Sequence, residues 1–352
     1  MPETCQVLYH HDNCINTKKA FVQTCHLCSD YCPHEALSQY REIDPKKCTE
    51  CGVCMAVCPT DGMADRQIDS FFEYVRNAEE VMLSCPEAMP GEYEIPCLGM
   101  FDRDTWILLM SLAKHKPVTV KTGVCAECAD RNACQTSIGY FKQLHSEWPE
   151  HAVVQIKVDP YDEAAVNAVE QPQPKKNDLG ADRRDAFLGW KKRSMDKIDS
   201  MFPTLTSSES WPVPKSRVNL VEYLADHPEE KVPYIALVIS DECTSCGVCA
   251  AICPQGAITK RGDGKEEPMR MVLEPMKCVQ CERCAIICRP KAITLENKSL
   301  SGRLLKGKIM LHEGKGLYCE RCGTQLFERS EPMLCISCAN TDASESYFSQ
   351  QP

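Results

Sequence analysis

Hydrophobic residues fall in short runs along this chain, and between residues 81 and 158 these runs alternate with longer amphipathic segments. This pattern predicts short strands separated by helices, because a strand needs only about four to eight suitable residues whereas a helix needs a longer periodic segment. The predicted strands cover 81–84, 93–96, 117–120 and 152–158, and the predicted helices cover 104–115 and 138–148. Alternation of strands and helices is typical of an α/β domain, and we expect one over residues 71–160.

The rest of the hydrophobic pattern is less regular. Residues 161–233 contain the polar stretch QPQPKKND at 171–178, which is typical of an exposed linker, and two segments that predict helices, 183–201 and 218–225. The tail 341–352 is polar, and we expect it to be disordered. No apolar run approaches the roughly 18 residues that a membrane-spanning helix needs, so no membrane segment is expected.

An internal repeat flanks the predicted α/β domain. Residues 14–63 and 243–295 each contain two cysteine runs, and in every run the last cysteine lies four residues before a small residue that is followed by an apolar one. Such a repeat indicates two copies of one structural unit. We therefore predict two small α+β modules, at 1–70 and 234–300, on either side of the α/β domain. The predicted fold class is a multidomain combination of α+β and α/β units.

Composition restricts the chemistry of the cysteines. The 352 residues include 26 cysteines, a content typical either of secreted disulfide-bonded proteins or of intracellular metal-binding proteins. Most of them stand in C-x2-C spacings, and the N-terminal residues lack the basic and apolar regions of a signal peptide. Both observations favour a cytoplasmic metal-binding protein. The net charge of −10 argues against general nucleic-acid binding, because nucleic-acid binders usually present a basic surface.

The complete cysteine runs predict [4Fe–4S] clusters. Each run has the order C-x2-C-x2-C-x3-C, in which the first three cysteines bind one cluster and the fourth binds the cluster of the neighbouring run. In the second module this rule assigns Cys243, Cys246, Cys249 and Cys288 to one cluster, and Cys278, Cys281, Cys284 and Cys253 to the other. Arg289 follows Cys288 where the motif usually has proline. A cation there could raise the potential of that cluster, although a solvated side chain is the simpler interpretation.

One run of the N-terminal module, TCHLCSDYCP at 24–33, lacks its first cysteine. The neighbouring run is complete, and the same rule assigns Cys48, Cys51, Cys54 and Cys32 to one cluster. The other cluster then has Cys25, Cys28 and Cys58 and needs a fourth ligand. The candidates are Cys5, Cys14, His10, His11, Asp12 or no residue, in which case the site would hold a three-iron cluster.

Both modules resemble bacterial-type ferredoxins with two [4Fe–4S] clusters. The spacing C-x10-C-x2-C-x3-C-P, which starts at Cys14, also resembles the opening of a group of multi-cluster bacterial ferredoxin proteins. This resemblance favours Cys14 as the fourth ligand. The ten residues between Cys14 and Cys25 also let the chain loop back, because the entropy of loop closure grows slowly with length. The chain would then hold four [4Fe–4S] clusters.

Five further cysteines lie at or just after the ends of the predicted strands, where open α/β sheets place ligands. They are Cys85, Cys97, Cys125, Cys128 and Cys134. The segments VMLSC, EIPCLGMFDRDTWILLMSLA and VTVKTGVCAECADRNAC resemble the delta subunit of methyl-viologen-reducing hydrogenase. The resemblance implies a [2Fe–2S] cluster that passes electrons between a hydrogenase and a heterodisulfide-reductase-type partner. A thiol site without a cluster, or buried structural cysteines, stay open as alternatives.

The C-terminal segment YCERCGTQLFERSEPMLCISC contains two C-x2-C pairs separated by twelve residues. Two such turns that face each other place four thiolates around one tetrahedral metal ion, the arrangement of a zinc ribbon. We predict a zinc ribbon over residues 301–340 whose ligands are Cys319, Cys322, Cys335 and Cys338. A rubredoxin-like iron site is the alternative, although its cysteine pairs usually stand further apart.

The motifs predict an electron-transfer protein rather than an enzyme that acts on an organic substrate. The chain lacks a G-x-G-x-x-G motif after a strand, a P-loop and the C-x3-C-x2-C motif of radical enzymes. We therefore expect a non-catalytic subunit of an anaerobic redox complex, with a hydrogenase, a formate dehydrogenase or a heterodisulfide-reductase-type protein as partner. Two alternatives stay open: an enzyme subunit with a catalytic thiol or metal site in the middle domain, and a redox-sensing nucleic-acid binder that uses the zinc ribbon.

Overall fold

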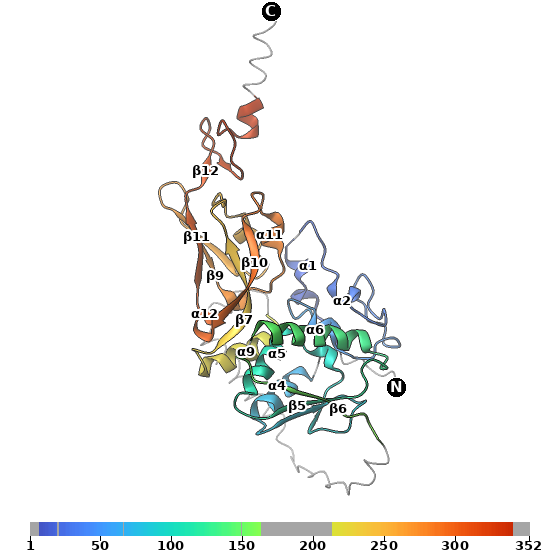
Figure 1. Cartoon of the computed structure of the whole chain (residues 1–352). Helices are drawn as coiled ribbons and strands as arrows, with labels where there is room; N and C mark the ends of the chain where they lie inside the picture. Colours follow the sequence, from blue (N-terminus) through green and yellow to red (C-terminus); the bar gives the residue numbers. More distant parts are fainter. Residues whose placement is uncertain (1–6, 20, 66, 149, 163–212, 341–352) are drawn as a thin grey trace, which may run out of the picture.

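The computed structural model describes residues 7–19, 21–65, 67–148, 150–162 and 213–340. In Figure 1 the described chain is elongated, with a parallel sheet at one end and a small C-terminal hairpin at the other. The linker predicted at 171–178, the helix predicted at 183–201 and the tail 341–352 lie outside the described residues. No helix in the described part of the chain combines the length and the apolar character that crossing a bilayer requires.

The middle of the chain forms a four-stranded, fully parallel sheet with the strand order β4-β3-β5-β6. The strands are β3 (Val81–Ser84), β4 (Tyr93–Glu94), β5 (Val118–Thr122) and β6 (Gln155–Val158). They confirm the four strands predicted from the hydrophobic runs. The helices are α4 (Ile68–Asn77), α5 (Arg103–Leu112) and α6 (Arg131–Glu147), and the 3-10 turn η2 (Leu98–Met100) precedes α5.

Helix α6 begins earlier than the sequence predicts, at Arg131 instead of residue 138. Its first two turns, RNACQTS, carry only small and polar residues, so they show no apolar period. The helix forms there because its small residues pack closely: Ala133 and Cys134 are buried, and Ala133 lies against Gly99 of η2. Tertiary packing, not hydrophobic patterning, therefore sets this end of the helix.

Helix α5 forms the centre of the middle domain. Every residue from Asp104 to Leu112 is buried, because the helix contacts β5, α6 and a further helix, α9 (Lys215–Asp226). Asp102 caps its N-terminus by accepting a hydrogen bond from the Thr105 N–H at 2.8 Å. Helix α9 confirms the helix predicted at 218–225, and its packing makes the C-terminal part of the segment 161–233 core structure rather than linker.

The N-terminal module consists mainly of cysteine loops. Strand β1 (Val7–Tyr9) pairs antiparallel with β2 (Met63–Asp65), which brings the two ends of the module together. Between these strands lie η1 (His11–Asn13), α1 (Ile15–Lys18), α2 (Leu27–Asp30) and α3 (Val53–Ala56). Each of these helical segments is about one turn long. With so little regular secondary structure, this module is stabilised largely by whatever group its cysteine loops bind.

The second module contains longer strands. Strands β7 (Lys231–Ile239) and β10 (Ile293–Ser301) form one antiparallel pair, and β8 (Ile258–Arg261), β9 (Met269–Leu273) and β11 (Ile309–Gly314) form a sheet in the order β11-β9-β8. The helical segments are α10 (Val248–Ile252), η3 (Pro275–Lys277), α11 (Arg283–Ile287) and α12 (Gly302–Lys306). Because β11 pairs with β9, residues 309–314 extend the sheet of this module. From the sequence, they are expected to belong to the zinc ribbon at 301–340. The hairpin of β12 (Leu317–Tyr318) and β13 (Gln325–Leu326) follows.

The two cysteine-run modules are joined by hydrogen bonds from a buried arginine and a half-buried lysine. Arg283 of α11 donates to the carbonyl oxygens of Ile15 and Lys19, both at 3.1 Å. Lys19 donates in the other direction, to the carbonyl oxygens of Ala251 and Cys253 at 2.8 Å. These bonds hold the N-terminal module against the helices that carry the cysteines of the second module.

Candidate iron–sulfur and metal centres

The three complete cysteine runs share one backbone conformation. The residues before and after the second cysteine both have positive φ in each run, with 60° and 76° at Glu50 and Gly52, 50° and 77° at Ser245 and Gly247, and 54° and 59° at Gln280 and Glu282. Left-handed residues placed in this way turn successive backbone N–H groups toward one side and form a nest that binds anions, including iron–sulfur clusters. The incomplete run differs, since His26, which follows Cys25, has a φ of −125°.

All four runs end in the same turn. The third residue after the last cysteine has positive φ in each, at Glu35, Asp61, Gly256 and Lys291. The next N–H donates to the cysteine sulfur in three runs: from Ala36 to Cys32 at 3.3 Å, from Gly62 to Cys58 at 3.2 Å and from Ala257 to Cys253 at 3.3 Å. This bond explains the small residue repeated in the sequence, because the backbone must approach the sulfur closely. Such a donor stabilises a thiolate.

The second module brings together both predicted sets of cysteines. One cavity is lined by Cys243, Cys246, Cys249 and Cys288, and another is lined by Cys253, Cys278, Cys281 and Cys284. Each cavity thus receives one cysteine from the other run. Helices α10 and α11 begin just before the third cysteine of each run, which directs Cys249 and Cys284 inward and leaves both buried.

The N-terminal module has a comparable cavity, lined by Cys32, Cys48, Cys51 and Cys54. The incomplete run contributes to a second group around Cys28. Burial raises the pKa of the Cys28 thiol to about 11, and the neighbouring cysteines Cys58, Cys25 and Cys14 add to the rise. Cys14 is buried, whereas His10, His11 and Asp12 are exposed, and Cys5 lies outside the described residues.

Burial also raises the pKa of thiols in the other sets. The pKa rises to about 11 at Cys51 and Cys281 and to about 12 at Cys249, mainly through desolvation and further through cysteines of the same set. Thiols packed in this way cannot all ionise unless positive charge lies among them. A metal group supplies that charge, since its cysteine ligands bind as thiolates. Four sulfurs around each cavity, with backbone N–H groups beside them, therefore fit an iron–sulfur cluster.

The five cysteines of the middle domain gather at the carboxyl ends of the parallel strands. Cys85 follows β3, Cys97 precedes η2, Cys125 and Cys128 lie between β5 and α6, and Cys134 lies in the first turn of α6. Burial raises the pKa of Cys134, and the thiols of Cys125, Cys97 and Cys128 add to the rise. Cys125 and Cys128 also neighbour Cys85. The sheet thus brings all five predicted residues into one group.

A contact that the sequence did not reveal joins this group to the N-terminal module. Gly99, two residues after Cys97, packs so closely that a Cβ on it would lie 3.1 Å from the carbonyl oxygen of Cys51. Beside it, Asp130 Oδ1 accepts a hydrogen bond from Thr49 Oγ1 at 2.7 Å and lies 2.6 Å from His34 Nε2. These residues are 81 and 96 positions from Asp130 in the sequence, so no local pattern could pair them.

The last four cysteines have a tighter geometry. The sulfur atoms of Cys319, Cys322, Cys335 and Cys338 all lie within 4.8 Å of one another, and those of Cys322 and Cys335 are 3.7 Å apart. Tetrahedral zinc with Zn–S bonds of about 2.3 Å would place its sulfurs about 3.8 Å apart. Backbone N–H groups of Cys335 and Cys322 lower the pKa of Cys319 to about 6, which favours a thiolate. The donor set fits one metal ion.

Comparison with protein-family models finds two matches. A 4Fe-4S dicluster domain matches residues 242–292, which include both runs of the second module, and a 4Fe-4S binding domain matches residues 41–63, which include the complete N-terminal run. No curated protein matches the chain. The chain therefore contains two ferredoxin-type 4Fe-4S domains within a mixed helix and sheet fold, together with a C-terminal group of cysteines. The ferredoxin-type domains support a role in electron transfer.

Proposed function

We propose that this chain is a multi-cluster electron-transfer protein. The observation that carries the proposal is that its cysteine groups follow one another in a row, which one cleft between the two modules interrupts. At one end of the row, Cys97 of the middle domain lies near Cys51 of the N-terminal module. Cys54, which belongs to the same set as Cys51, lies near Cys28 of the next set. Each set thus neighbours the next along this half of the row.

The row continues into the second module across a cleft of about 640 Å³. Cys25 and Cys58 line the cleft on the side of the N-terminal module, and Cys281 lines it on the side of the second module. Cys284, in the same set as Cys281, then lies near Cys249 of the last set. The proposed row of cysteine sets therefore extends from the middle domain, through both ferredoxin-type modules, to the end nearest the C-terminal hairpin.

We assign a [2Fe–2S] cluster to the middle-domain cysteines, a [4Fe–4S] cluster to each of the four sets of the ferredoxin-type modules, and zinc to the C-terminal group. In order along the row, the four proposed [4Fe–4S] sets are Cys32, Cys48, Cys51 and Cys54; Cys14, Cys25, Cys28 and Cys58; Cys253, Cys278, Cys281 and Cys284; and Cys243, Cys246, Cys249 and Cys288. When bound, such clusters take up and release single electrons. The chain's own residues bury the sets, hold them side by side and direct N–H groups at their sulfurs.

We propose that the electrons are exchanged with partner proteins of the hydrogenase, formate dehydrogenase or heterodisulfide-reductase type, with this chain as a non-catalytic subunit. Ferredoxin-type domains suggest redox partners. Two exposed positions beside the row support partner contact: Leu27, between Cys25 and Cys28, is 39% exposed, and Val124, next to Cys125, is 42% exposed. A partner at either position would approach a cysteine group without displacing packed structure.

Anaerobic purification with metal analysis and an EPR-monitored redox titration tests the proposal. Four [4Fe–4S] clusters and one [2Fe–2S] cluster would give about 18 iron atoms per chain, together with about one zinc. Loss of the middle cluster alone would leave about 16. A value near eight iron atoms would contradict the proposed row, since only two of its four [4Fe–4S] sets could then be loaded.

A further inference from the structure

The C-terminal hairpin covers one of the cysteine loops. Thr244 and Ser245, which stand between Cys243 and Cys246, are 2% and 0% exposed. Thr244 Oγ1 donates to the carbonyl oxygen of Phe327 at 3.2 Å, and Gln325 Nε2 donates to the carbonyl oxygen of Ser245 at 3.4 Å. In the complete N-terminal run the residue that corresponds to Thr244 is Thr49, and it is exposed. The hairpin and β11, whose His312 Nε2 lies 3.1 Å from Ser245 Oγ, together cover this pair of residues.

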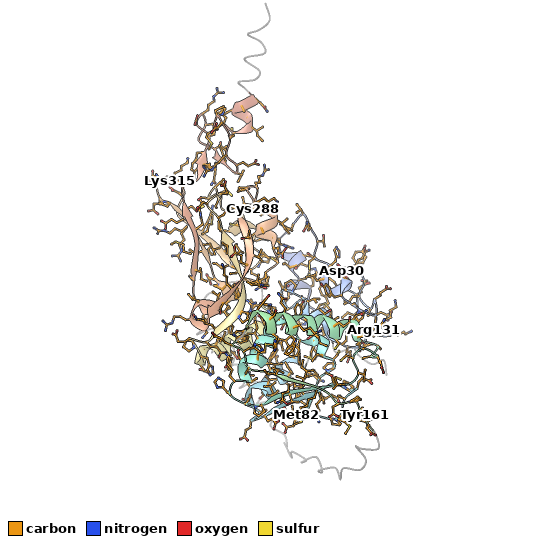
Figure 2. All side chains as sticks on the ribbon, in the orientation of Figure 1. Asp30, Met82, Arg131, Tyr161, Cys288 and Lys315 are labelled. Atoms are coloured by element: carbon orange, nitrogen blue, oxygen red, sulfur yellow. The ribbon has the colours of Figure 1, made fainter. Side chains whose placement is uncertain are left out.

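One hairpin side chain lines the cavity of this set, and a second pairs with a residue that lines it. Phe327 lines the same cavity as Cys243, Cys246, Cys249 and Cys288. Its neighbour Glu328 forms an ion pair with Arg289 at 2.6 Å, and Arg289 also lines that cavity, next to Cys288. Figure 2 shows Cys288 at the end of the second module that faces the hairpin. The aromatic ring of Phe327 and the ion pair of Arg289 with Glu328 therefore both lie beside this proposed cluster site.

We propose that the metal-binding hairpin is a cap that sets the redox potential of the Cys243 set and limits access to it. The inference rests on the proposed function, because it requires a cluster in this set and a metal ion at the hairpin cysteines. The metal would hold the hairpin folded, and the folded hairpin places Phe327 and Glu328 on the cluster site. Residues 317–340 thereby control the last site of the row.

Both side chains act on the potential in the same direction. Reduction adds one electron, and therefore negative charge, to the site, and the potential of such a cluster depends on solvent exposure and nearby charge. Phe327 is 46% exposed, but it lines the cavity and keeps water off that side of the site, where water would stabilise the added charge. Glu328 offsets part of the positive charge of Arg289, which would otherwise stabilise the added electron, and the effect is small because both side chains are more than half exposed to solvent. Together they lower the potential, so removing the cap raises it. This set exchanges its electron with the neighbouring Cys253 set and with a partner protein, and no bond is formed or broken.

The first test compares the full chain with the double variant Phe327→Ala, Glu328→Gln in an EPR-monitored titration with dithionite as reductant. The reduction potential of one [4Fe–4S] cluster should rise by about 59 mV, which corresponds to a tenfold change in the equilibrium constant for adding one electron. The potentials of the other clusters should stay unchanged. Arg329→Gln is the matched control, because it removes an exposed charge from the same hairpin. Phe327→Leu should retain most of the wild-type potential, since it keeps an apolar side chain.

The second test measures backbone hydrogen exchange in segment 243–249 after Cys338→Ser, which removes a proposed metal ligand. Exchange in this segment should rise several-fold, while the reference segment 48–54, which the hairpin does not touch, should be unchanged. The inference would be overturned if the double variant had the same potentials as Arg329→Gln. It would also be overturned if hydrogen exchange in segment 243–249 did not change in Cys338→Ser. A wild-type chain without [4Fe–4S] signals would instead overturn the proposed function itself.

Discussion

Cys14 and Cys58 lie against the same small residue, Gly62. A Cβ on Gly62 would lie 3.3 Å from the Cα of Cys14 and 3.4 Å from the Sγ of Cys58. The sequence restricts the fourth ligand of this set to a few residues before Cys25, but spacing alone cannot choose among them. Among the candidates that the structure describes, burial favours Cys14, because it is buried beside Cys28 while the nearby histidines face solvent.

Replacing Cys14 with serine tests this assignment directly. We expect one of the four [4Fe–4S] signals to disappear or to be converted to the signal of a three-iron cluster, because the site would keep only three thiolates. Metal analysis should show a loss of about one to four iron atoms per chain. His11→Ala serves as the control and should leave both measurements unchanged. Wild-type iron content and EPR spectra in the Cys14 variant would rule out this ligand.

Asp102 is a buried carboxyl group that links the middle domain to α9. It accepts hydrogen bonds from Thr105 and from Ser216. Burial and, second, the charge of Asp104 raise the pKa of Asp102 from 3.8 to about 6. The folded state therefore binds this proton more tightly than the unfolded state. The group favours folding most at low pH, and its contribution is lost as the pH rises through about 6.

Asp102→Asn should remove this pH dependence, because its amide oxygen still accepts from Thr105 while its NH₂ group donates to the hydroxyl of Ser216. Relative to wild type, the variant should gain about 1 kcal/mol in the free energy of unfolding between pH 5 and pH 7, because only the wild type has to ionise a buried carboxyl group over that range. Denaturant unfolding of the anaerobically prepared protein at several pH values measures the difference. A difference that stays constant with pH would contradict the raised pKa.

At the scale of elements, the sequence predicts what depends on local pattern. The strands β3 and β5 follow from short apolar runs, and the cysteine spacing anticipates which thiols share a cavity. The early start of α6 and the pairing of β11 with β9 were not predicted, because both depend on partners distant in the sequence. The same holds for the contact of Asp130 with Thr49. Local chemistry is readable from the sequence, whereas the junctions between elements are not.

The junction between η2 and α6 depends on the absence of a side chain at Gly99. A Cβ there would lie 2.8 Å from the Cβ of Ala133 and 3.1 Å from the Cys51 carbonyl oxygen. Gly99→Ala should therefore lower the free energy of unfolding by about 1 to 3 kcal/mol, as overpacked cores do. It should also weaken iron loading, since Cys51 and Cys97 lie on either side of the contact.

Gly139→Ala is the matched control for that prediction. Gly139 lies within α6, and a Cβ on it would meet nothing within 4 Å. Alanine should raise the free energy of unfolding by about 0.5 to 1 kcal/mol, because it restricts the unfolded chain and suits a helix better. Both variants are compared by denaturant unfolding and iron analysis. Equal effects of the two substitutions would show that the contact at Gly99 is not tight.

At the scale of the whole molecule, the proposed row depends on how the modules are held together. Each module contains its own cysteine sets, but the cleft between Cys58 and Cys281 lies where the N-terminal module meets the second one. Arg283 crosses this boundary: it is 4% exposed, donates to two carbonyl oxygens of the N-terminal module and stacks its guanidinium over Phe21 at 4.9 Å. The distance between the two halves of the row therefore depends on a few polar contacts that no sequence motif indicates.

Arg283→Ala should uncouple the two halves without removing a cysteine. We expect wild-type iron content but electron equilibration between the modules that is slower by several-fold, because the loss of these hydrogen bonds lets the cleft widen. Rapid photoreduction followed by freeze-quench EPR measures how fast the sets of the two modules reach equilibrium. Arg303→Ala is the control, since that arginine pairs with Glu229 on the surface of the same module. Arg283→Lys should restore part of the rate, because a shorter cation still donates across the boundary. If equilibration in the alanine variant is as fast as in wild type, Arg283 does not set the distance that the electrons cross at this cleft.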